Sequence, residues 1–384
     1  MKIVHLCNYY QPQMTYQESC LAYAHRDLGH QVSVVTSDRY FPFPEYETTV
    51  QKILGKRYVG TGVFDDKGVT VYRLPVRVEK SARVWLKDLE KVLLDIQPDF
   101  ILCHGLFNFS AFRLLWVSKR LNVRIVFDEH IIPSVVRTGL MSKMIYFLYR
   151  LFLTKKIERV AERIVGISDG CMPVLKQYLG FNTDKLKMIP LGTDVTVFKP
   201  DASKRAQKRL ELGILDNQIV VLYTGKIYLG KNAELIIQAI DELNRPDLNI
   251  VSVFVGSVAI PFQETWGNIV SKAQHKVHHI KMVDTKELVS FFNAADIAAW
   301  PGLPTISTIE ASACGCPIIC SDDLTERFQN NSGFGVPEGN YESFKKALYT
   351  MLLDENLRLK MSQNARELAE QIFDWRIIAE KFIA

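Results

Sequence analysis

Short apolar runs alternate with helical patterns over the first half of the chain. Six runs rich in β-branched residues predict strands that are covered on both faces, because such strands are apolar almost throughout. They span residues 2–8, 31–37, 69–75, 100–105, 124–130 and 163–168. Helical patterns lie between them, for example at 17–29 and 108–121. This alternation predicts a parallel sheet with helices on its faces.

The same pattern begins again after residue 200. Strands are predicted at 218–225, 249–256, 296–300 and 317–321, with helices at 232–243 and 305–314. The stretch "MIPLGTDVTVFKPD", 188–201, has turn residues and two prolines, which is typical of a junction. We therefore predict an α/β protein with two doubly wound, Rossmann-like domains, over 1–195 and 196–365. Such sheets bind ligands beyond the carboxyl ends of their strands, so two facing domains would form a cleft.

Composition is consistent with two soluble domains. The chain has 384 residues, which exceeds a usual single core, and 48% of them are hydrophobic. No apolar run is long enough to span a bilayer, and the N-terminus predicts a first strand rather than a signal peptide. The seven cysteines have no regular spacing, which favours reduced thiols. We expect a cytoplasmic protein.

Positive charge is concentrated in the first half. Residues 1–195 hold 27 Lys and Arg against 19 Asp and Glu, whereas residues 196–384 hold 20 against 23. An anionic partner on the first domain would explain this, and so would a solvated surface. The segment 137–163 carries seven basic and two acidic residues among aromatic and aliphatic ones. It predicts either a helix lying on an anionic membrane or a helix with its apolar face in the core. No nucleic-acid partner is expected.

The stretch "YTGKIYLGKN", 223–232, has the pattern of an anion site. A strand ends at Gly225, and Lys226 and Lys231 flank a loop before a helix. Free amides at a helix start favour negative charge, and two lysines suit a diphosphate. Solvated loop lysines are the alternative interpretation.

A second anion site is predicted in "WPGLPTISTIEASACGCP", 300–317. Here the amides of Thr305, Ile306 and Ser307 would open a helix and cradle a phosphate. Glu310 follows in the same helix, among uncharged neighbours. One carboxylate can accept two hydroxyl hydrogen bonds from a diol, although a solvent-facing glutamate is the simpler alternative.

Taken together, the motifs resemble a nucleotide-sugar glycosyltransferase of the GT-B fold, glycosyltransferase family 4. The resemblance runs from end to end. It is carried by "GHQVSVVTSD", "RIVGISDGCMPVLKQYLG", "KLKMIPLGTDVTVFKP", "YTGKIYLGKN", "TIEASACGCPII" and "FDWRIIAEKF". It implies a retaining transferase whose C-terminal helix, within 366–384, packs back on the first domain.

The resemblance also assigns residues. Lys226 and Lys231 match the basic pair that holds the donor diphosphate, and Glu310 matches the glutamate that binds the ribose. His130, in "FDEH", matches a histidine near the sugar ring. The donor pocket would further include the helix amides named above and Gly225, Gly256, Ser257, Thr15 and Tyr16.

Two positions depart from the family pattern. The partner glutamate expected eight residues before Glu310 is Gly302, which we interpret as a vacated role in an open turn. The glycines expected in the N-terminal loop are Thr15 and Tyr16. Because a Cβ limits φ, either the loop still bends close or the side chains of Thr15 and Gln17 replace its backbone donors.

Several polar residues near strand ends carry weaker predictions. Asp128 and Glu129 are more typical of carboxylates that orient loop amides, and His104 is at least as consistent with packing as with substrate contact. The histidines of "HKVHH", 275–279, are expected to precede a strand without an acidic neighbour, so no metal site is expected there.

The expected reaction is transfer of a hexose-type sugar from a UDP or GDP sugar to a glycan or lipid-linked acceptor, in cell-surface polysaccharide or glycolipid biosynthesis. No metal or other cofactor is expected, because lysines and amides would neutralise the diphosphate and no Asp-x-Asp motif is present. The enzyme could lie on the inner face of the plasma membrane. A protein that binds nucleotide sugar or glycan without transfer is the second hypothesis, motivated by Gly302 and Thr15.

Overall fold

The computed structural model describes residues 1–133, 136, 139–302 and 305–384. It divides into two compact units. Unit 1 comprises Met1–Leu191 and Trp375–Ala384, and unit 2 comprises Gly192–Asp374. The division after residue 191 lies within the junction predicted at 188–201. Residues 366–374, which we assigned to the returning helix, belong instead to unit 2.

Unit 1 is built on an eight-stranded sheet of order β10-β9-β8-β7-β1-β2-β4-β3. All neighbouring strands are parallel except the β3–β4 pair. The strands are β1 (Lys2–Leu6), β2 (Gln31–Ser37), β3 (Gly62–Asp66), β4 (Val69–Leu74), β7 (Phe100–His104), β8 (Arg124–Glu129), β9 (Arg163–Gly166) and β10 (Leu186–Met188). The predicted apolar runs account for six of these strands.

Helices cover both faces of this sheet, as alternate side chains on each buried strand require. One face packs a core that includes Leu6, Val35 and Phe127, and the other includes Ile3, Val34 and Val126. The helical segments of the unit are α1 (Gln17–Asp27), α2 (Tyr46–Thr49), α3 (Gln51–Leu54), α4 (Leu89–Ile96), α5 (Phe109–Val117), α6 (Leu140–Tyr149), π-helix η3 (Arg150–Thr154), α7 (Lys155–Val160), α8 (Cys171–Pro173), π-helix η4 (Val174–Tyr178) and the short 3-10 turn η1 (Pro12–Met14).

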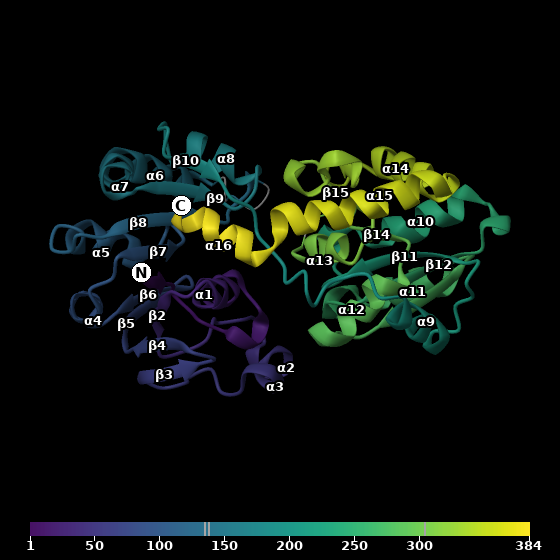
Figure 1. The fold of residues 1–384 in the computed structure, drawn as a ribbon. Coiled ribbons are helices and arrows are strands. Elements are labelled where there is room, and N and C mark those ends of the chain that lie inside the picture. Colours follow the sequence, from purple (N-terminus) through teal and green to yellow (C-terminus); the bar gives the residue numbers. More distant parts are fainter. Residues whose placement is uncertain (134–135, 137–138, 303–304) are drawn as a thin grey trace. The chain divides into compact units, whose positions relative to one another are not determined.

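The last helix, α16 (Trp375–Ile383), belongs to unit 1 although it follows unit 2 in the chain. Figure 1 shows it in yellow beside α1. Its buried residues Ile378, Ala379 and Phe382 join the core that also contains Leu21 and Ala22 of α1. The predicted return of the terminal helix to the first domain is therefore seen in the structure.

Unit 2 is built on a six-stranded, fully parallel sheet of order β13-β12-β11-β14-β15-β16. Its strands are β11 (Ile219–Thr224), β12 (Ile250–Val255), β13 (Lys276–Ile280), β14 (Ile297–Ala299), β15 (Ile318–Ser321) and β16 (Gly333–Val336). Its helical segments are α9 (Ala202–Glu211), η5 (Leu229–Lys231), α10 (Glu234–Leu243), η6 (Pro246–Leu248), η7 (Ile260–Phe262), α11 (Gln263–Lys272), α12 (Thr285–Ala294), α13 (Ser307–Ala313), η8 (Thr325–Arg327), η9 (Gln329–Asn331), α14 (Tyr341–Leu353), α15 (Glu355–Leu368) and π-helix η10 (Ala369–Phe373).

The elements that the sequence did not predict lie mostly at sheet edges. β3, β13 and β16 are edge strands, and β5 (Val76–Lys80) and β6 (Arg83–Leu86) form a separate antiparallel pair. Edge strands are exposed on one side and carry polar residues, so they lack the apolar run of a central strand. The prediction that all three histidines of 275–279 precede a strand is wrong for His278 and His279, which lie within β13.

In each unit the strand order reverses at one point, where such sheets bind ligands. In unit 1 this point lies between β1 and β7, and in unit 2 between β11 and β14. Thr15 and Tyr16 lie in the loop after β1, His104 is the last residue of β7, and the segments after β11 and β14 contain Lys226, Lys231 and Gly302. The fold therefore gathers the predicted site residues at the switch points of the two sheets.

Candidate functional site

Gly225 and Gly256 form the floor of the site in unit 2. They follow β11 and β12, with φ of +131° and +154°. A Cβ on Gly256 would lie 2.0 Å from the Gly225 carbonyl oxygen, so only glycine permits the two loops to leave the sheet together. The Ile227 amide then donates to the Ser257 carbonyl at 2.9 Å. Ser257 itself is exposed at the rim.

The two lysines of the following loop differ in environment. Lys226 is exposed, and its carbonyl accepts a 3.1 Å hydrogen bond from the Tyr223 hydroxyl, which shapes the turn. Lys231 is half-buried in η5. Burial lowers its pKa to about 8, against the opposing charge of Glu338. An incoming diphosphate would restore full protonation, so Lys231 is suited to neutralise developing negative charge.

Glu338 is a residue that the sequence did not indicate. It follows β16, and burial together with Asp323 raises its pKa. Its Oε1 atom is buried and has no hydrogen-bond partner among the described residues. Thr224 and Thr305 also carry buried hydroxyls without such a partner. Unsatisfied polar atoms of this kind are rare in proteins and mark this end of the sheet as a place for a polar ligand.

Gly302 corrects the prediction of an open turn. It is buried, and a Cβ there would lie 2.7 Å from the carbonyl carbon and oxygen of Lys231 and 2.8 Å from the Gly230 oxygen. The requirement is close approach of two backbones, since Gly302 does not have a positive φ. The position therefore cannot hold a glutamate without displacing the lysine loop. The neighbouring Leu303 and Pro304 of the predicted turn lie outside the described residues.

We expect Gly302→Ala to destabilise unit 2. The added methyl group meets backbone rather than a flexible side chain, so the Lys231 loop must move. Overpacking of this kind costs about 1–3 kcal/mol. Chemical denaturation of wild type and variant measures the difference, and Gly267→Ala, where a Cβ meets nothing within 4 Å, is the matched control. Equal stability of Gly302→Ala and wild type would contradict the close approach.

The helix after Gly302 begins later than predicted. α13 starts at Ser307, with Ile306 as its N-cap, so Thr305 precedes the helix. The amides of Thr305, Ile306 and Ser307 make no hydrogen bond to a described residue, as a phosphate cradle requires. Buried Arg327 fixes this turn by donating to the Thr305 carbonyl at 2.7 Å and the Thr308 hydroxyl at 2.5 Å. Arg327 is a supporting residue that sequence reasoning missed.

Glu310 lies in the first turn of α13 and is half-buried. Burial raises its pKa to about 7, while a hydrogen bond with Ser307 acts in the opposite direction. No basic side chain contributes to this shift. The carboxylate is thus uncompensated, and a diol that donates two hydroxyl hydrogen bonds would stabilise its charged form.

We expect Glu310→Gln to weaken nucleoside binding and to remove its pH dependence. Wild-type affinity should rise as pH increases through about 7, because the carboxylate accepts both ribose hydroxyls only when charged. Calorimetry with a nucleoside, which has no titrating phosphate, measures this directly. The 2′,3′-dideoxy nucleoside is the control and should bind both proteins alike. A pH-independent wild-type affinity would remove Glu310 from the site.

The N-terminal loop of unit 1 keeps a glycine-like turn despite its side chains. Thr15 has φ of +51° and ends η1 in the left-handed conformation. Its hydroxyl donates to the Met14 carbonyl at 2.8 Å. Gln17 is buried, with no hydrogen-bond partner for its side chain among the described residues. The loop therefore bends as glycines would, and the side chain of Thr15 is already engaged. Tyr16 is the N-cap of α1, and its ring is exposed.

His130 follows β8 and is held between two carboxylates. Its Nε2 lies 3.5 Å from Oδ1 of Asp128, and its amide donates to Oε1 of Glu129 at 2.8 Å. Glu129 also accepts from the Ile131 amide at 3.1 Å, as predicted for a carboxylate that orients loop amides. Burial disfavours the imidazolium, but Asp128, with help from Glu18 and Glu129, outweighs this and raises the pKa of His130 to about 9. His130 is therefore cationic at neutral pH.

Asp128 is fully buried and joins His130 to His104. His104 Nδ1 lies 2.7 Å from Oδ2 of Asp128, and the Gly105 amide donates to Oδ1 at 2.9 Å. Burial disfavours the charged carboxylate, yet the two histidines lower its pKa. Polar atoms of His104, Asp128 and His130 lie within 4.8 Å of one another. The contacts of His104 and His130 with Asp128 account for this proximity, and a metal-independent reaction remains a prediction.

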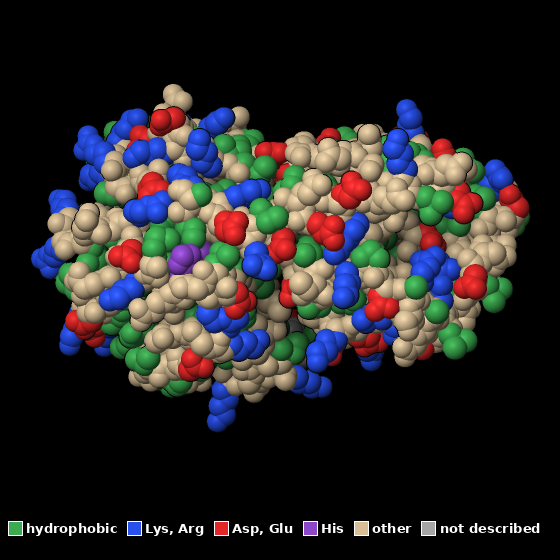
Figure 2. Space-filling model, in the orientation of Figure 1, with side chains coloured by type: hydrophobic (Ala, Val, Ile, Leu, Met, Phe, Trp, Pro, Cys, Tyr) green, Lys and Arg blue, Asp and Glu red, His purple; other side chains and the backbone are tan. Residues whose placement is uncertain are grey.

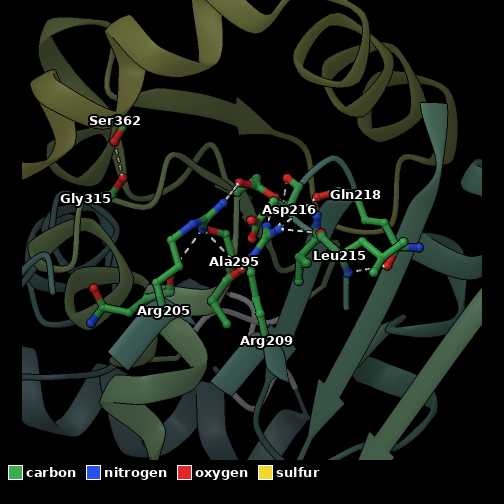
Figure 3. A network of polar contacts seen from close by, with 12 residues as sticks. Arg205, Arg209, Leu215, Asp216, Gln218, Ala295, Gly315 and Ser362 are labelled. Atoms are coloured by element: carbon green, nitrogen blue, oxygen red, sulfur yellow. Dashed lines mark hydrogen bonds and ion pairs between the residues drawn. The ribbon is translucent and has the colours of Figure 1, made fainter. Parts of the chain in front are cut away.

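A pocket of about 850 Å³ in unit 2 lies at the opposite, amino end of its sheet. Figure 3 shows the polar network there, in which Arg205 and Arg209 each contact Asp296 at 2.6 Å. Arg209 also donates to the carbonyls of Ala294, Leu215 and Gln218. Asp296 and backbone carbonyls at the ends of strands and helices thus accept hydrogen bonds from both guanidinium groups, which gives the network a structural role.

Protein contacts account for two of the "HKVHH" histidines, His275 and His279, whereas the buried Nε2 of His278 has no hydrogen-bond partner among the described residues. His275 has an acidic neighbour, contrary to prediction, because its Nδ1 lies 2.6 Å from Asp241, and its Nε2 lies 2.9 Å from the Ser252 hydroxyl. His279 Nε2 lies 3.0 Å from the Gly256 carbonyl, which supports the floor of the site.

Two family models match the chain, one in each half. Glycosyltransferase Family 4 matches residues 20–197, and Glycosyl transferases group 1 matches residues 204–368. The chain therefore belongs to the glycosyltransferases of the family-4 type and has the GT-B fold of two Rossmann-like domains.

Similar proteins agree with this class. D-inositol 3-phosphate glycosyltransferase of Paenarthrobacter aurescens (strain TC1) is 25% identical over 226 residues, 56% of this chain and 55% of the relative. The chain thus spans about half the length of the curated relatives it matches. Anabaena HepE in complex with UDP has a TM-score of 0.70 at 16% identity, covering 100% of this chain and 98% of that one. Sucrose-phosphate synthase from Thermosynechococcus elongatus has a TM-score of 0.68 at 18% identity, covering 99% and 97%.

Among the helices that the structure describes, none is both long enough and apolar enough to cross a membrane.

Proposed function

We propose that the protein is a retaining hexosyltransferase that uses a UDP or GDP sugar. The observation that carries the proposal is the arrangement at the switch point of unit 2. There, the backbone of half-buried Lys231 packs against Gly302, and the uncompensated carboxylate of Glu310 stands in the helix that follows. These groups complement a diphosphate and a ribose diol. Donor binding would fall mainly to unit 2 and acceptor binding mainly to unit 1.

The charge state of His130 supports a reaction without a protein base. With a pKa of about 9, His130 holds its proton at neutral pH and is poorly suited to accept one from an acceptor hydroxyl. The leaving diphosphate would itself take that proton on the face where it departs, which retains the anomeric configuration. Lys226, Lys231 and the amides at 305–307 would stabilise the leaving charge, and one such preorganised donor is typically worth ~2.7–4 kcal/mol.

Similar proteins support the donor class. Solved structures of HepE contain UDP and UDP-glucose. The curated relatives are glycosyltransferases that act on D-inositol 3-phosphate by name, which fits an acceptor other than protein or nucleic acid. For this chain we propose a glycan or lipid-linked acceptor in cell-surface polysaccharide or glycolipid synthesis.

The competing function is binding without transfer. The packing of Gly302 favours it, because no acidic side chain fits at that position beside the Lys231 backbone. Against it stand Lys231 and His130, whose shifted pKa values are typical of reacting centres.

The stereochemistry of the product tests the proposed reaction. With an α-linked UDP or GDP hexose and a lipid-extract acceptor, NMR of the product should show an α linkage. A β linkage would contradict retention. Tight nucleotide binding with no product across the donor panel would instead favour the binding function.

A hydrophobic and basic surface on unit 1 is suited to a membrane acceptor. In α6 and η3 the apolar side chains that face solvent are Leu140, Met141, Met144, Ile145, Phe147, Leu148, Leu151 and Phe152. Leu140 is 86% exposed and Phe147 63% exposed. Tyr149 and Thr154 of this segment are buried, and Tyr146 and Leu153 pack against the core that contains Tyr149. The exposed face therefore favours the membrane interpretation of segment 137–163 over a fully buried helix.

Basic side chains border this surface, which we call the α6–η3 surface. Lys143, Arg150, Lys155, Lys156 and Arg159 are all exposed, and Figure 2 shows Lys and Arg side chains gathered over the α6–α7 region. Arg137 and Thr138, at the start of the predicted segment, lie outside the described residues. The combination of apolar and cationic groups suits an anionic bilayer surface.

An apolar groove of about 360 Å³ opens beside this surface. It is lined mainly by aromatic and aliphatic residues of α5, α6 and η3, among them Phe109, Phe112, Ile145, Leu148 and Phe152. Such a groove fits an acyl or isoprenoid chain rather than a free sugar. A lipid-linked acceptor is consistent with both features.

We expect charge reversal at Lys155, Lys156 and Arg159 to release the protein from anionic vesicles. Each of the three basic residues near the membrane surface contributes about 1 kcal/mol to the free energy of membrane binding. The partition coefficient of the protein between vesicles and solution should therefore fall by roughly two orders of magnitude. Sedimentation with phosphatidylserine vesicles measures this. Reversal of Lys272, Lys281 and Lys286, exposed lysines of unit 2, is the control. Equal sedimentation of the two variants would contradict a specific role for the α6–η3 surface.

A further inference from the structure

A chain of three buried histidines runs from the C-terminal helix to Asp128. His25 Nε2 lies 3.0 Å from the Ala379 carbonyl oxygen of α16, and His25 Nδ1 lies 3.0 Å from His5 Nε2. His5 Nδ1 lies 3.1 Å from His104 Nε2, and His104 Nδ1 lies 2.7 Å from Asp128. His5 and His25 are completely buried, and His104 is 8% exposed. Four hydrogen-bond contacts therefore link a helix carbonyl to the carboxylate beside His130.

The contacts at the two ends of this chain set its proton count. A carbonyl and a carboxylate can only accept, so each end needs an N–H from the ring next to it. A neutral imidazole supplies one N–H and one acceptor nitrogen. Three neutral rings supply three protons, whereas the four contacts require four. The His25–His5–His104 chain, together with Asp128, therefore holds one proton more than three neutral histidines and a carboxylate would.

The direction of the hydrogen bonds locates this extra proton. The Ala379 carbonyl requires that His25 donate from Nε2, so a neutral His25 accepts at Nδ1 and His5 donates to it. His5 in turn accepts from Nε2 of His104. Burial lowers the pKa of both His5 and His25, which disfavours a charge on either ring. The extra proton therefore lies in the contact between His104 and Asp128, where the carboxylate balances it.

We propose that the docking of α16 is coupled to uptake of this proton, so that the position of the C-terminal helix controls the charge of the Asp128 group that positions His130. If the Ala379 carbonyl withdraws, three contacts remain and three protons satisfy them. His104 then donates to Asp128 from a neutral ring, and His5 and His25 reverse their direction. The docked and undocked states differ by one proton. Docking is accordingly favoured by lower pH.

The consequence for His130 follows from charge. In the docked state the proton between His104 and Asp128 offsets only part of the Asp128 charge that acts on His130, and in the undocked state the whole charge acts, so undocking should raise the pKa of His130 further. Several other titratable groups act on this chain and on His130, and none of them contacts the Ala379 carbonyl. They are His30, Glu18, Glu129, Cys7 and Cys103. The face that α16 itself presents to the unit 1 core is apolar, through Ile378 and Phe382.

NMR of the full-length protein with ¹⁵N-labelled histidine tests the proton count. At neutral pH, His104 should show two protonated ring nitrogens, and His5 and His25 should show one each, at Nε2. A singly protonated His104, or protonation of His25 at Nδ1 only, would overturn the proposal. The measurement does not depend on the proposed transferase activity, so its failure is distinguishable from failure of that reaction.

Two variants at one position separate the coupling from simple loss of a ring. In His25→Gln the amide can donate to Ala379 and accept from His5, so His104 should keep both protons. In His25→Leu the chain ends at His5, two contacts need two protons, and His104 should lose one. The proposal is wrong if both variants give the same His104 state. Should His25→Leu not fold, loss of the second His104 proton in His25→Gln contradicts the proposal.

Hydrogen exchange of α16 tests the coupling to docking. In the wild-type protein, the protection of the α16 amides against hydrogen exchange, corrected for intrinsic exchange rates, should fall once the pH is high enough to remove the extra proton. The expected slope approaches tenfold per pH unit for one coupled proton. In His25→Leu, the protection of the α16 amides should not depend on pH. Equal slopes in the two proteins would show that docking and protonation are independent.

Discussion

Replacement of Lys231 by methionine should lower turnover by two to three orders of magnitude. The side chain is half-buried beside the glycines of the site, where water screens its charge poorly. A donor that stabilises charge only in the transition state is worth about 10²–10³ in kcat. Lys226→Met should cost about tenfold, at the low end of the effect of a charged hydrogen bond, because that lysine is exposed. Steady-state kinetics with the preferred donor measure both.

The pH profile distinguishes a charge effect from a structural one. Burial places the pKa of Lys231 at about 8, so the free enzyme loses this charge as pH rises through that value, and kcat/KM should fall there. Lys231→Arg should move this limb to higher pH. Thermal stability should be nearly unchanged in Lys231→Met, because a buried lysine with a lowered pKa contributes little as a charge. Wild-type turnover in Lys231→Met would remove the residue from the reaction.

His130→Ala should impair transfer by about 10²-fold while leaving nucleotide affinity nearly unchanged, the usual scale for loss of a positioned acid or charge. The residue lies in unit 1, whereas Lys231 and Glu310, which we propose bind the diphosphate and the ribose, lie in unit 2. Asp128→Asn is the informative companion variant. Asp128 raises the pKa of His130 to about 9, so Asp128→Asn should lower that pKa. The pH at which activity is lost through deprotonation of His130 should then be lower in the variant than in the wild type. Calorimetry that shows nucleotide affinity falling in step with turnover in His130→Ala would contradict this role.

Much of the fold was predictable because its central strands are buried on both faces. Runs such as 31–37 and 100–105 are apolar almost throughout, and β2 and β7 occupy them within a residue. The edge strand β13 has the sequence KVHHI, in which one lysine and two histidines stand among only two aliphatic residues, so its histidines were interpreted as preceding a strand rather than as part of one. Exposure on one side of an edge removes the signal on which the prediction depends.

The site was predictable where chemistry shows in residue type and not where it depends on close approach. Lysines, a helix glutamate and a strand-end histidine indicate their chemistry by themselves. The need for glycine at position 302 comes from the backbone of Lys231, seventy-one positions away, and no local pattern reports it. Glu338, whose charge acts on Lys231, and Arg327, which donates to the Thr305 carbonyl, are likewise distant in sequence from the residues they affect. No local pattern therefore indicates their roles.

The histidine chain was partly accessible from strand periodicity. Alternate residues of a strand share a face, so His5 lies on the side of Ile3, His104 on the side of Leu102, and Asp128 on the side of Val126. These apolar neighbours belong to one core, which also contains α1 and α16. Sequence places the three polar groups on one face only once strand order is known, because β1, β7 and β8 are neighbours in the sheet but distant in the chain.

The most direct test of the account is release of nucleotide from a panel of UDP and GDP sugars, with and without a membrane lipid extract. Wild-type protein should release nucleotide from at least one hexose donor, faster with the extract, and yield a glycosylated product. Lys231→Met should retain nucleotide binding and lose most of that release. Nucleotide binding without acceptor-dependent release from any donor, or equal release by wild type and Lys231→Met, would contradict the proposal that this site transfers a sugar.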